Sequence, residues 1–368
     1  MWVLVVNAGS SSLKLRLLDG QDVISRSADL PAGPDGLDTS RLAEILGGWR
    51  KPDVVGHRIV HGGSLFAGPV RIDDTVREQL RELTDRAPLH QPKSLAALDA
   101  VTARLPDITA VASFDTAFHA TIPAAAATYA IPLEWRKRYG IRRYGFHGLS
   151  HAYCSARAAQ LLGRPLPDLR VITCHLGAGA SLAAVLDGRS VDTTMGFTPL
   201  EGLVMATRSG TVDPGLVLWL EEHEHLSPHE IATALESRSG LLSLAGTADM
   251  RQVQAAADNG DADAQLAIDV YIHRLAGGIA SMTAAAGGVD VLAFTGGVGE
   301  GSAMVRQQAA QRLGFLGVAI DRDRNDAVRG DCDISAAGTT ARTLVITARE
   351  DLQIAREARQ LLGIRSRR

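Results

Sequence analysis

Apolar and polar positions alternate from the start of the chain in a way that predicts paired strands. Residues 3–6 are a short, β-branched apolar run that stops at Asn7, Ala8 and Gly9, which is typical of a buried strand entering a tight turn. In residues 13–18, leucines alternate with a lysine and an arginine before an Asp-Gly pair. This pattern predicts a returning strand that ends at a turn.

The same pattern recurs in residues 171–188. Laid without gaps on residues 3–20, this second stretch places Gly177 on Gly9 and Leu186 on Leu18, and five of the eighteen positions are identical. Strand, glycine turn, strand and Asp-Gly recur in the same order, which indicates an internal duplication with a cleft between two similar halves.

The rest of the chain alternates predicted helices and strands, which indicates an α/β protein. Helices are predicted over residues 40–46, 75–86, 94–104 (with Ser94 as cap), 151–163, 216–223, 228–236, 250–258, 263–286, 302–313 and 351–362, and further strands over residues 54–61, 108–114, 289–294 and 344–346. Residues 123–144 are interpreted as a crossing between halves, and residues 192–215 as a long loop.

Composition excludes several classes of protein. A chain of 368 residues with 46% hydrophobic content is long enough for two domains. It shows neither a membrane-length apolar stretch nor the pattern of a signal peptide, and its three cysteines have no CxxC spacing, which favours free thiols in a reducing cytoplasm. A net charge of −3 offers no broad basic surface for nucleic acid.

Known nucleotide-binding and metal motifs are absent. No GxxxxGK[ST] occurs, and the glycine turns at Gly177 and Gly297 lack the third glycine of GxGxxG. Two histidine pairs have i,i+4 spacing (residues 57/61 and 147/151), but without an HExxH context we interpret them as structural.

Three glycine turns follow predicted strands, at Gly9, at residues 177–179 and at residues 296–301. Each one alone fits a packing role. Together with hydroxyls, an amide and Lys14 in the first turn, they fit a nucleotide whose phosphates approach bare backbone; a serine-rich hairpin with a surface lysine is the alternative for that first turn.

Charged residues mark further candidate positions. Asp115 follows a predicted strand, where ligands bind in α/β sheets. Arg58 and Arg208 lie in Gly-rich stretches without a helical face, and arginine recognises carboxylate and phosphate. His147 is a weaker candidate, since a lone histidine is more often structural, and Asp249 is interpreted on local grounds as a helix cap.

Seven stretches together resemble the acetate kinase family very closely, in order and over nearly the whole chain. They are NAGSSSLK (residues 7–14), GHRIVHGG (56–63), FDTAFH (114–119), YGFHGLSH (144–151), MGFTPLEG (195–202), TRSG (207–210) and FTGGVGE (294–300).

The resemblance implies an α/β protein with a duplicated ribonuclease-H-like (actin-like ATPase) fold, its two domains lying around a nucleotide cleft. The first domain would comprise residues 1–119 plus 352–368, and the second residues 120–351. The resemblance further implies a cytoplasmic homodimer that uses ATP/ADP with Mg²⁺ (Mn²⁺ as an alternative) and binds acetate or another short-chain carboxylate and acetyl phosphate, but neither nucleic acid nor membrane.

Roles for individual residues also follow from the resemblance. Catalysis would rest on Asp115, His147 and Arg208, and the metal would lie at Asn7 and Glu350. The carboxylate substrate would contact Arg58, with Val60, Leu89, Phe146 and Pro199 around its methyl group. The nucleotide would contact Ser10, Ser12, Lys14, His175, Leu176, Gly177, Ala178, Gly179, Asp249, Met250, Arg251, Gly297, Val298, Gly299, Glu300 and Gly301.

The implied reaction is reversible transfer of the ATP γ-phosphoryl group to acetate. A carboxylate is already ionised at neutral pH, so the reaction needs positive charge and positioning rather than a strong base, and we expect Asp115 mainly to orient Mg²⁺ or solvent. Alternatives are a propionate or butyrate kinase, a non-catalytic actin-like ATP-binding protein, and a sugar kinase, which the apolar pocket residues disfavour.

The chain departs from the family pattern at three places. Ala178 and Gly301 stand where asparagines are usual, and the region between Lys14 and Arg58 is shorter than in most members. The glycine turns themselves are kept, so we expect activity with an altered affinity for nucleotide.

Overall fold

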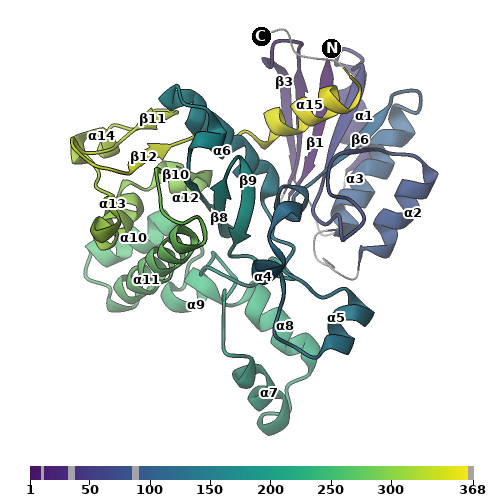
Figure 1. Ribbon diagram of the computed structural model, residues 1–368. Coiled ribbons are helices and arrows are strands. Elements are labelled where there is room, and N and C mark those ends of the chain that lie inside the picture. The colour runs from purple at the N-terminus through teal and green to yellow at the C-terminus, as the bar shows by residue number, and fades with distance from the viewer. Residues whose placement is uncertain (10–11, 32–37, 85–90, 364–368) are drawn as a thin grey trace. The chain divides into compact units, whose positions relative to one another are not determined.

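The computed structural model describes residues 1–9, 12–31, 38–84 and 91–363. Ser10 and Leu89, both predicted at the site, lie outside these ranges. The chain divides into two compact units: unit 1 is residues 1–120, 146–153 and 349–368, and unit 2 is residues 121–145 and 154–348. Each unit contains one six-stranded sheet (Figure 1).

Unit 1 is built on a mixed sheet with strand order β3-β2-β1-β4-β6-β5. Strands β1, β4 and β6 are parallel, and β2, β3 and β5 run antiparallel to their neighbours. The strands are β1 (Val3–Ala8), β2 (Ser12–Leu18), β3 (Ile24–Pro31), β4 (Val54–Ile59), β5 (Val70–Arg71) and β6 (Ala110–Phe114).

Helices cover both faces of this sheet. The unit 1 helices are α1 (Thr39–Gly47), α2 (Asp74–Glu82), α3 (Gln91–Arg104) and α15 (Glu350–Leu361), with a short 3-10 turn η2 (Ala117–Thr121) after β6. α3 packs on β1 and β4, and α15, drawn in yellow in Figure 1, packs on β1, β4 and β6. Because side chains alternate along β4, Arg58 shares the face of Gly56, whose Cα lies against Ile354 of α15.

Unit 2 repeats this topology with strand order β9-β8-β7-β10-β12-β11. Strands β7, β10 and β12 are parallel, and β8, β9 and β11 are antiparallel to their neighbours. The strands are β7 (Val171–Leu176), β8 (Ala180–Leu186), β9 (Arg189–Thr193), β10 (Val291–Thr295), β11 (Cys332–Asp333) and β12 (Arg342–Val345). The predicted duplication is therefore confirmed.

Among the helical elements of unit 2, α11 packs on β7, β8 and β9, and α12 packs on β7 and β10. They are α4 (Ala124–Ala127), α5 (Leu133–Tyr139), η3 (Leu166–Asp168), α7 (Pro214–His223), α8 (Pro228–Ser237), α9 (Gly240–Ala245), α10 (Met250–Asp258), α11 (Ala262–Ala285), α12 (Gly296–Gly301), α13 (Ala303–Arg312), η4 (Gly314–Leu316) and α14 (Arg322–Asp326). Helix α6 (Gly148–Leu162) gives its first residues to unit 1 and the rest to unit 2.

The gapless alignment of the two halves is wrong by one residue in the returning strand. Ala8 pairs with Leu13, whereas Leu176 pairs with Ala180, so the second turn is one residue shorter. A β-bulge at Leu17/Leu18 in the first half recurs at Ala184/Val185 in the second. Leu18 therefore corresponds to Val185 and not to Leu186, because a bulge marks a definite place in a strand pair.

Three other details differ from the sequence prediction. Ser94 does not cap its helix, because α3 already begins at Gln91 and Ser94 is buried within it. The predicted turn at residues 296–301 is the short helix α12, and α2 ends at Glu82. The described residues include no helix with the length and hydropathy of a membrane span.

Candidate functional site

Arg58 and Asp115 meet at the carboxyl ends of two neighbouring parallel strands of unit 1. Arg58 is the fifth residue of β4, and Asp115 directly follows β6, where its backbone N–H donates to the carbonyl of Ile59 (3.0 Å). Arg58 Nε donates to Asp115 Oδ1 (3.0 Å) and Nη2 to Oδ2 (2.5 Å). The side chains are 14% and 1% exposed, so this is a buried, bidentate ion pair.

Two further predicted residues extend this pair into a network. Arg58 Nη1 donates to Asn7 Oδ1 (3.1 Å), and Asn7 Nδ2 donates to Glu350 Oε2 (2.8 Å). Asn7 lies on β1 and Glu350 is the first residue of α15, so residues 343 positions apart are joined by one hydrogen bond. Lys14 faces Asn7 across the β1–β2 pair, which places both side chains on one face of the sheet.

Burial and charge act against each other at this network. Burial raises the pKa of Asp115 above its ordinary value, and the Arg58 guanidinium opposes that rise. Burial disfavours the charged form of Arg58, but Asp115 and Glu350 outweigh it and raise the pKa of Arg58. The guanidinium therefore stays charged and is the fixed cation of the site.

His147 holds a strained backbone position beside Asp115. Its φ of 56° lies in the left-handed region, which is uncommon for a residue with a side chain. The next residue, Gly148, donates its N–H to the carbonyl of Asp115 (2.8 Å), and a Cβ on Gly148 would lie 2.2 Å from that oxygen. The structure thus brings the predicted residues 115 and 147 together through Gly148.

The predicted pocket residues are divided between the two units. Val60 and Phe146 are buried in unit 1, and Phe146 packs edge-on against His61 with ring centroids 5.5 Å apart. The Phe146 carbonyl is also 3.0 Å from Nε2 of His119, a buried histidine whose pKa is lowered by burial to about 4. Pro199 belongs to unit 2.

In unit 2 the structure places two predicted nucleotide segments side by side. The turn after β7 is closed by a hydrogen bond from Gly177 N–H to the Gly179 carbonyl (2.9 Å). β10 pairs in parallel with β7 and leads into α12, and a Cβ on Gly296 would lie 2.7 Å from the Leu176 carbonyl. Residues 175–179 and 296–301 therefore lie at adjacent strand ends, where α/β proteins bind ligands.

Glu300 and Arg306 hold α12 in place, a role that the sequence did not reveal. Glu300 Oε1 accepts from the N–H groups of Gly296 (3.0 Å) and Ala348 (2.9 Å). Arg306 is 1% exposed and donates Nη1 to the carbonyls of Gly299 (2.9 Å) and Glu300 (2.7 Å). No local pattern in the sequence distinguishes Arg306 from a surface arginine.

Two other predicted nucleotide contacts have local structural roles. Asp249 is the N-cap of α10, as its neighbours in sequence suggested, and accepts from the Arg251 backbone and side chain. That arginine lowers the pKa of Asp249 to about 2. The side chain of Arg251 is 90% exposed, whereas Met250 is buried.

Arg208 lies in the loop before α7, and its Nη1 donates to the carbonyl of Pro199 (3.1 Å). The same loop is linked to the glycine turn after β7, because the Ala206 N–H donates to the Ala178 carbonyl (3.1 Å). The predicted transition-state residue and one predicted phosphate turn are thus connected within unit 2.

The oxygen atoms of the unit 1 network fit a magnesium ion. Asn7, Asp115 and Glu350 offer amide and carboxylate oxygens, which Mg²⁺ prefers. Over the described ranges, no group of three or more His, Cys, Asp or Glu residues forms a metal cluster. Asn7 and Glu350 would supply only part of the shell of a magnesium ion, and bound phosphate and water would complete it.

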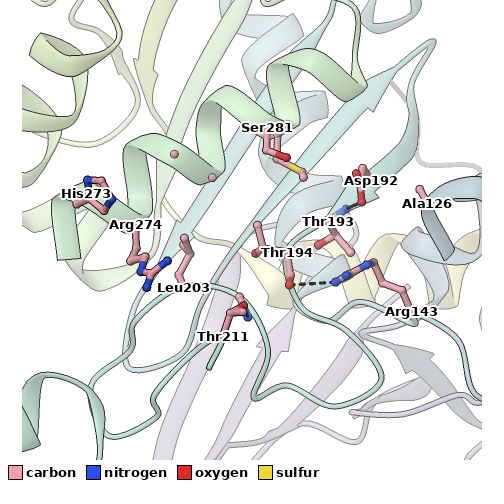
Figure 2. Close-up of a pocket in the computed structure, with 14 residues that line it drawn as sticks. Ala126, Arg143, Asp192, Thr193, Thr194, Leu203, Thr211, His273, Arg274 and Ser281 are labelled. Atoms are coloured by element: carbon pink, nitrogen blue, oxygen red, sulfur yellow. Dashed lines mark hydrogen bonds between the residues drawn. The ribbon is translucent and has the colours of Figure 1, made fainter. Parts of the chain in front are cut away.

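A cavity of about 400 Å³ lies elsewhere in unit 2, between α11 and β9 (Figure 2). Arg143, Asp192, Thr194 and Arg274 are among the residues that line it, and none of the described residues predicted at the site does so.

Three kinds of comparison with known proteins relate this chain to the same family. A family model described as the acetokinase family matches residues 41–356. An acetate kinase of Nostoc sp. is 50% identical over 320 residues, which cover 87% of this chain and 79% of the relative. The crystal structure of Porphyromonas gingivalis acetate kinase is 37% identical with a TM-score of 0.89 and covers 98% of this chain and 99% of that one. A propionate kinase structure from Francisella tularensis is 36% identical with a TM-score of 0.89, covering 97% and 98%.

Proposed function

The chain belongs to the acetokinase family, and from this premise we propose that it is an acetate kinase that transfers the γ-phosphoryl group of ATP reversibly to the carboxylate of acetate. The observation that carries the proposal is the network of Asn7, Arg58, Asp115 and Glu350. It sets one permanent cation among oxygen ligands at the carboxyl ends of the unit 1 strands.

Arg58 is the residue that we assign to the substrate carboxylate. A guanidinium has five N–H donors: Arg58 uses Nε and one N–H of Nη2 on Asp115, and Nη1 on Asn7 Oδ1 and, at 3.5 Å, on the Ala8 carbonyl. The second Nη2 hydrogen has no acceptor within the described residues and is available to an acetate oxygen. Asp115 then holds the planar group in register, so that acetate meets a preorganised donor.

Arg208 and His147 are the donors that we assign to the transferring phosphoryl group, whose charge is spread over its equatorial oxygens in the transition state. Asn7 and Glu350 would hold Mg²⁺, which neutralises phosphate charge when bound. The backbone turn at residues 177–179, with Lys14, would contact the nucleotide phosphates, and the segment around residues 297–301 the nucleoside. Asp115 has no proton to remove, because acetate is already ionised.

A propionate kinase is the second candidate, since the Francisella tularensis structure carries that name. Val60 and Phe146 supply an apolar environment, and one methylene in such a pocket is worth about 1–3 kcal/mol. Family resemblance also supports a cytoplasmic location and a homodimer. Light scattering on the purified protein tests for the dimer.

A coupled assay with ATP and Mg²⁺ that compares acetate, propionate and butyrate tests both candidates. We expect acyl phosphate, trapped as the hydroxamate, with the highest kcat/KM for acetate. A higher kcat/KM for propionate selects the second candidate, and no acyl phosphate from any of the three rejects both.

A further inference from the structure

The segment that carries Arg208 contains neither helix nor strand, yet much of it is buried. This segment, residues 194–213, is called the Arg208 loop here, and it connects β9 to α7. Met195 and Met205 are fully buried, and Leu203 is 4% exposed. A long irregular segment with buried backbone needs partners for its polar groups from outside the regular ladders.

One partly buried ion pair supplies such partners at the beginning of the loop. Arg143 Nη2 donates to Glu201 Oε1 (2.6 Å), and Arg143 Nη1 donates to the carbonyls of Thr194 (3.1 Å) and Met195 (3.0 Å). Figure 2 shows the bond to Thr194 at the edge of the cavity. The guanidinium of Arg143, which lies outside the Arg208 loop, therefore binds both the beginning and the middle of the loop.

Tyr129 completes the arrangement. Its hydroxyl donates to Glu201 Oε2 and accepts from the backbone N–H of Phe197 (3.0 Å). The guanidinium of Arg143 lies 5.5 Å from the centroid of the Tyr129 ring. Burial and the Glu201 carboxylate raise the pKa of Tyr129, so the hydroxyl keeps the proton that it donates to Glu201.

The backbone of the loop lies directly against this pair. A Cβ on Gly196 would be 1.8 Å from Glu201 Oε2 and 2.1 Å from the Tyr129 hydroxyl, so only glycine fits. The Gly196 carbonyl also accepts from the N–H groups of Tyr144 (3.0 Å) and Gly145 (3.3 Å).

The restrained stretch includes the carbonyl that binds Arg208. Pro199 lies between Phe197 and Glu201, both of which bind the Tyr129 hydroxyl, and its carbonyl accepts from Arg208 Nη1 (3.1 Å). We infer that Tyr129, Arg143 and Glu201 are positioning residues that set the Pro199 carbonyl and, through it, the guanidinium of Arg208. This inference rests on the proposed function, in which Arg208 stabilises the transferring phosphoryl group.

Two conservative variants test it: Glu201→Gln removes the charge and Tyr129→Phe removes one hydroxyl. Each should lower kcat about 10- to 100-fold, the loss expected when a donor is displaced, with KM for ATP little changed. The matched control is Asp290→Asn, which weakens another arginine–carboxylate pair of unit 2, with Arg170 (2.8 Å and 2.9 Å), and should leave kcat unchanged.

A double-mutant cycle separates positioning from general structural damage. If Glu201 acts through Arg208, the effect of Glu201→Gln disappears in an Arg208→Ala background. If the two effects multiply, the inference is wrong.

Arg143→Ala gives a second test, because Arg143 lines the cavity of about 400 Å³ and methylguanidinium can enter the vacated space. Recovery of activity supports the inference, and Arg170→Ala with the same additive is the control.

Hydrogen–deuterium exchange keeps the test independent of turnover. The Arg208 loop should exchange faster in Glu201→Gln than in Asp290→Asn, and equal exchange in the two variants would overturn the proposed restraint. The proposed function and the restraint can fail separately. If the wild-type protein makes no acyl phosphate, while the loop still exchanges faster in Glu201→Gln than in Asp290→Asn, the proposed function is rejected and the restraint of the loop is retained.

Discussion

Arg58 and Asp115 lie 57 positions apart in the sequence and share two parallel hydrogen bonds, of 3.0 Å and 2.5 Å. Removing one member of a buried pair leaves the other charge without compensation. We therefore expect Arg58→Ala to lower the free energy of unfolding by about 3–5 kcal/mol. Urea denaturation measures this change, and acyl phosphate formation measures the accompanying loss of activity.

The double variant Arg58→Met/Asp115→Leu serves as the control for that prediction. It removes both charges and should recover most of the lost stability while remaining inactive. A loss below about 1 kcal/mol in Arg58→Ala, the value typical of a surface pair, would show that the pair is not effectively buried.

Lower pH should destabilise unit 1 through His57. This histidine is buried on β4, its Nε2 has no hydrogen-bond partner within the described residues, and burial lowers its pKa to about 3. The unfolded chain binds a proton below pH 6.5 but the folded chain does not, so stability is full above about pH 6.5 and falls as the pH drops toward 3. Between pH 7 and pH 5 we expect a loss of about 2 kcal/mol from this group.

Urea midpoints at pH 5, 6 and 7 test that expectation. His119, with a pKa lowered to about 4, acts in the same direction, so His57→Gln should reduce the pH dependence without abolishing it. An unchanged pH dependence in His57→Gln would contradict the assignment.

Gly148→Ala should damage both stability and activity. The new Cβ would lie 2.2 Å from the Asp115 carbonyl oxygen and 2.9 Å from the Phe118 side chain, so the backbone behind the ion pair must move. We expect the free energy of unfolding to fall by about 1–3 kcal/mol and kcat to decrease. Gly47→Ala is the matched control: its Cβ meets nothing within 4 Å at the end of α1, and it should be neutral or stabilising by at most about 1 kcal/mol.

Ala178→Asn tests whether the phosphate turn accepts another donor. Ala178 is exposed on the turn after β7, and its carbonyl accepts from the Ala206 N–H. An added amide that reaches a nucleotide phosphate would lower KM for ATP roughly 2- to 10-fold, the equivalent of one hydrogen bond of about 0.5–1.5 kcal/mol. The control is Ala178→Asp, whose side chain has nearly the shape of asparagine but carries a negative charge that repels phosphate, so this variant should raise KM for ATP. Equal KM values for the two variants would exclude contact with phosphate.

The duplicated sheet could be predicted because each hairpin carries its own signal in consecutive residues. Alternation along β2 and the glycine turns after β1 and β7 depend only on local sequence. The one-residue difference between the two turns could not be predicted, since a gapless alignment matches Asp187 and Gly188 to the wrong positions of the first half. Register is determined by pairing across strands.

The sequence motifs indicated candidate site residues, but they did not indicate the residues that hold those candidates in place. Arg143 and Glu201 are 58 positions apart, and Arg306 binds Asn325 nineteen positions away. Such contacts leave no periodic trace in the sequence, because the residues beside these arginines in the chain are of the same kinds as those beside an exposed arginine. The short helix α9 was also missed, since Gly240 begins it with a φ of 65° and the helix has only six residues.

Helix α15 is translated more than 200 residues after the strands that it covers. Leu352, Ile354 and Ala355 are buried, α15 packs on β1, β4 and β6, and Arg359 donates to the side chain of Asp22. A nascent chain therefore exposes one apolar face of the β1–β4–β6 region until α15 has been synthesised, so that face of the unit 1 sheet cannot be covered before residues 350–361 leave the ribosome.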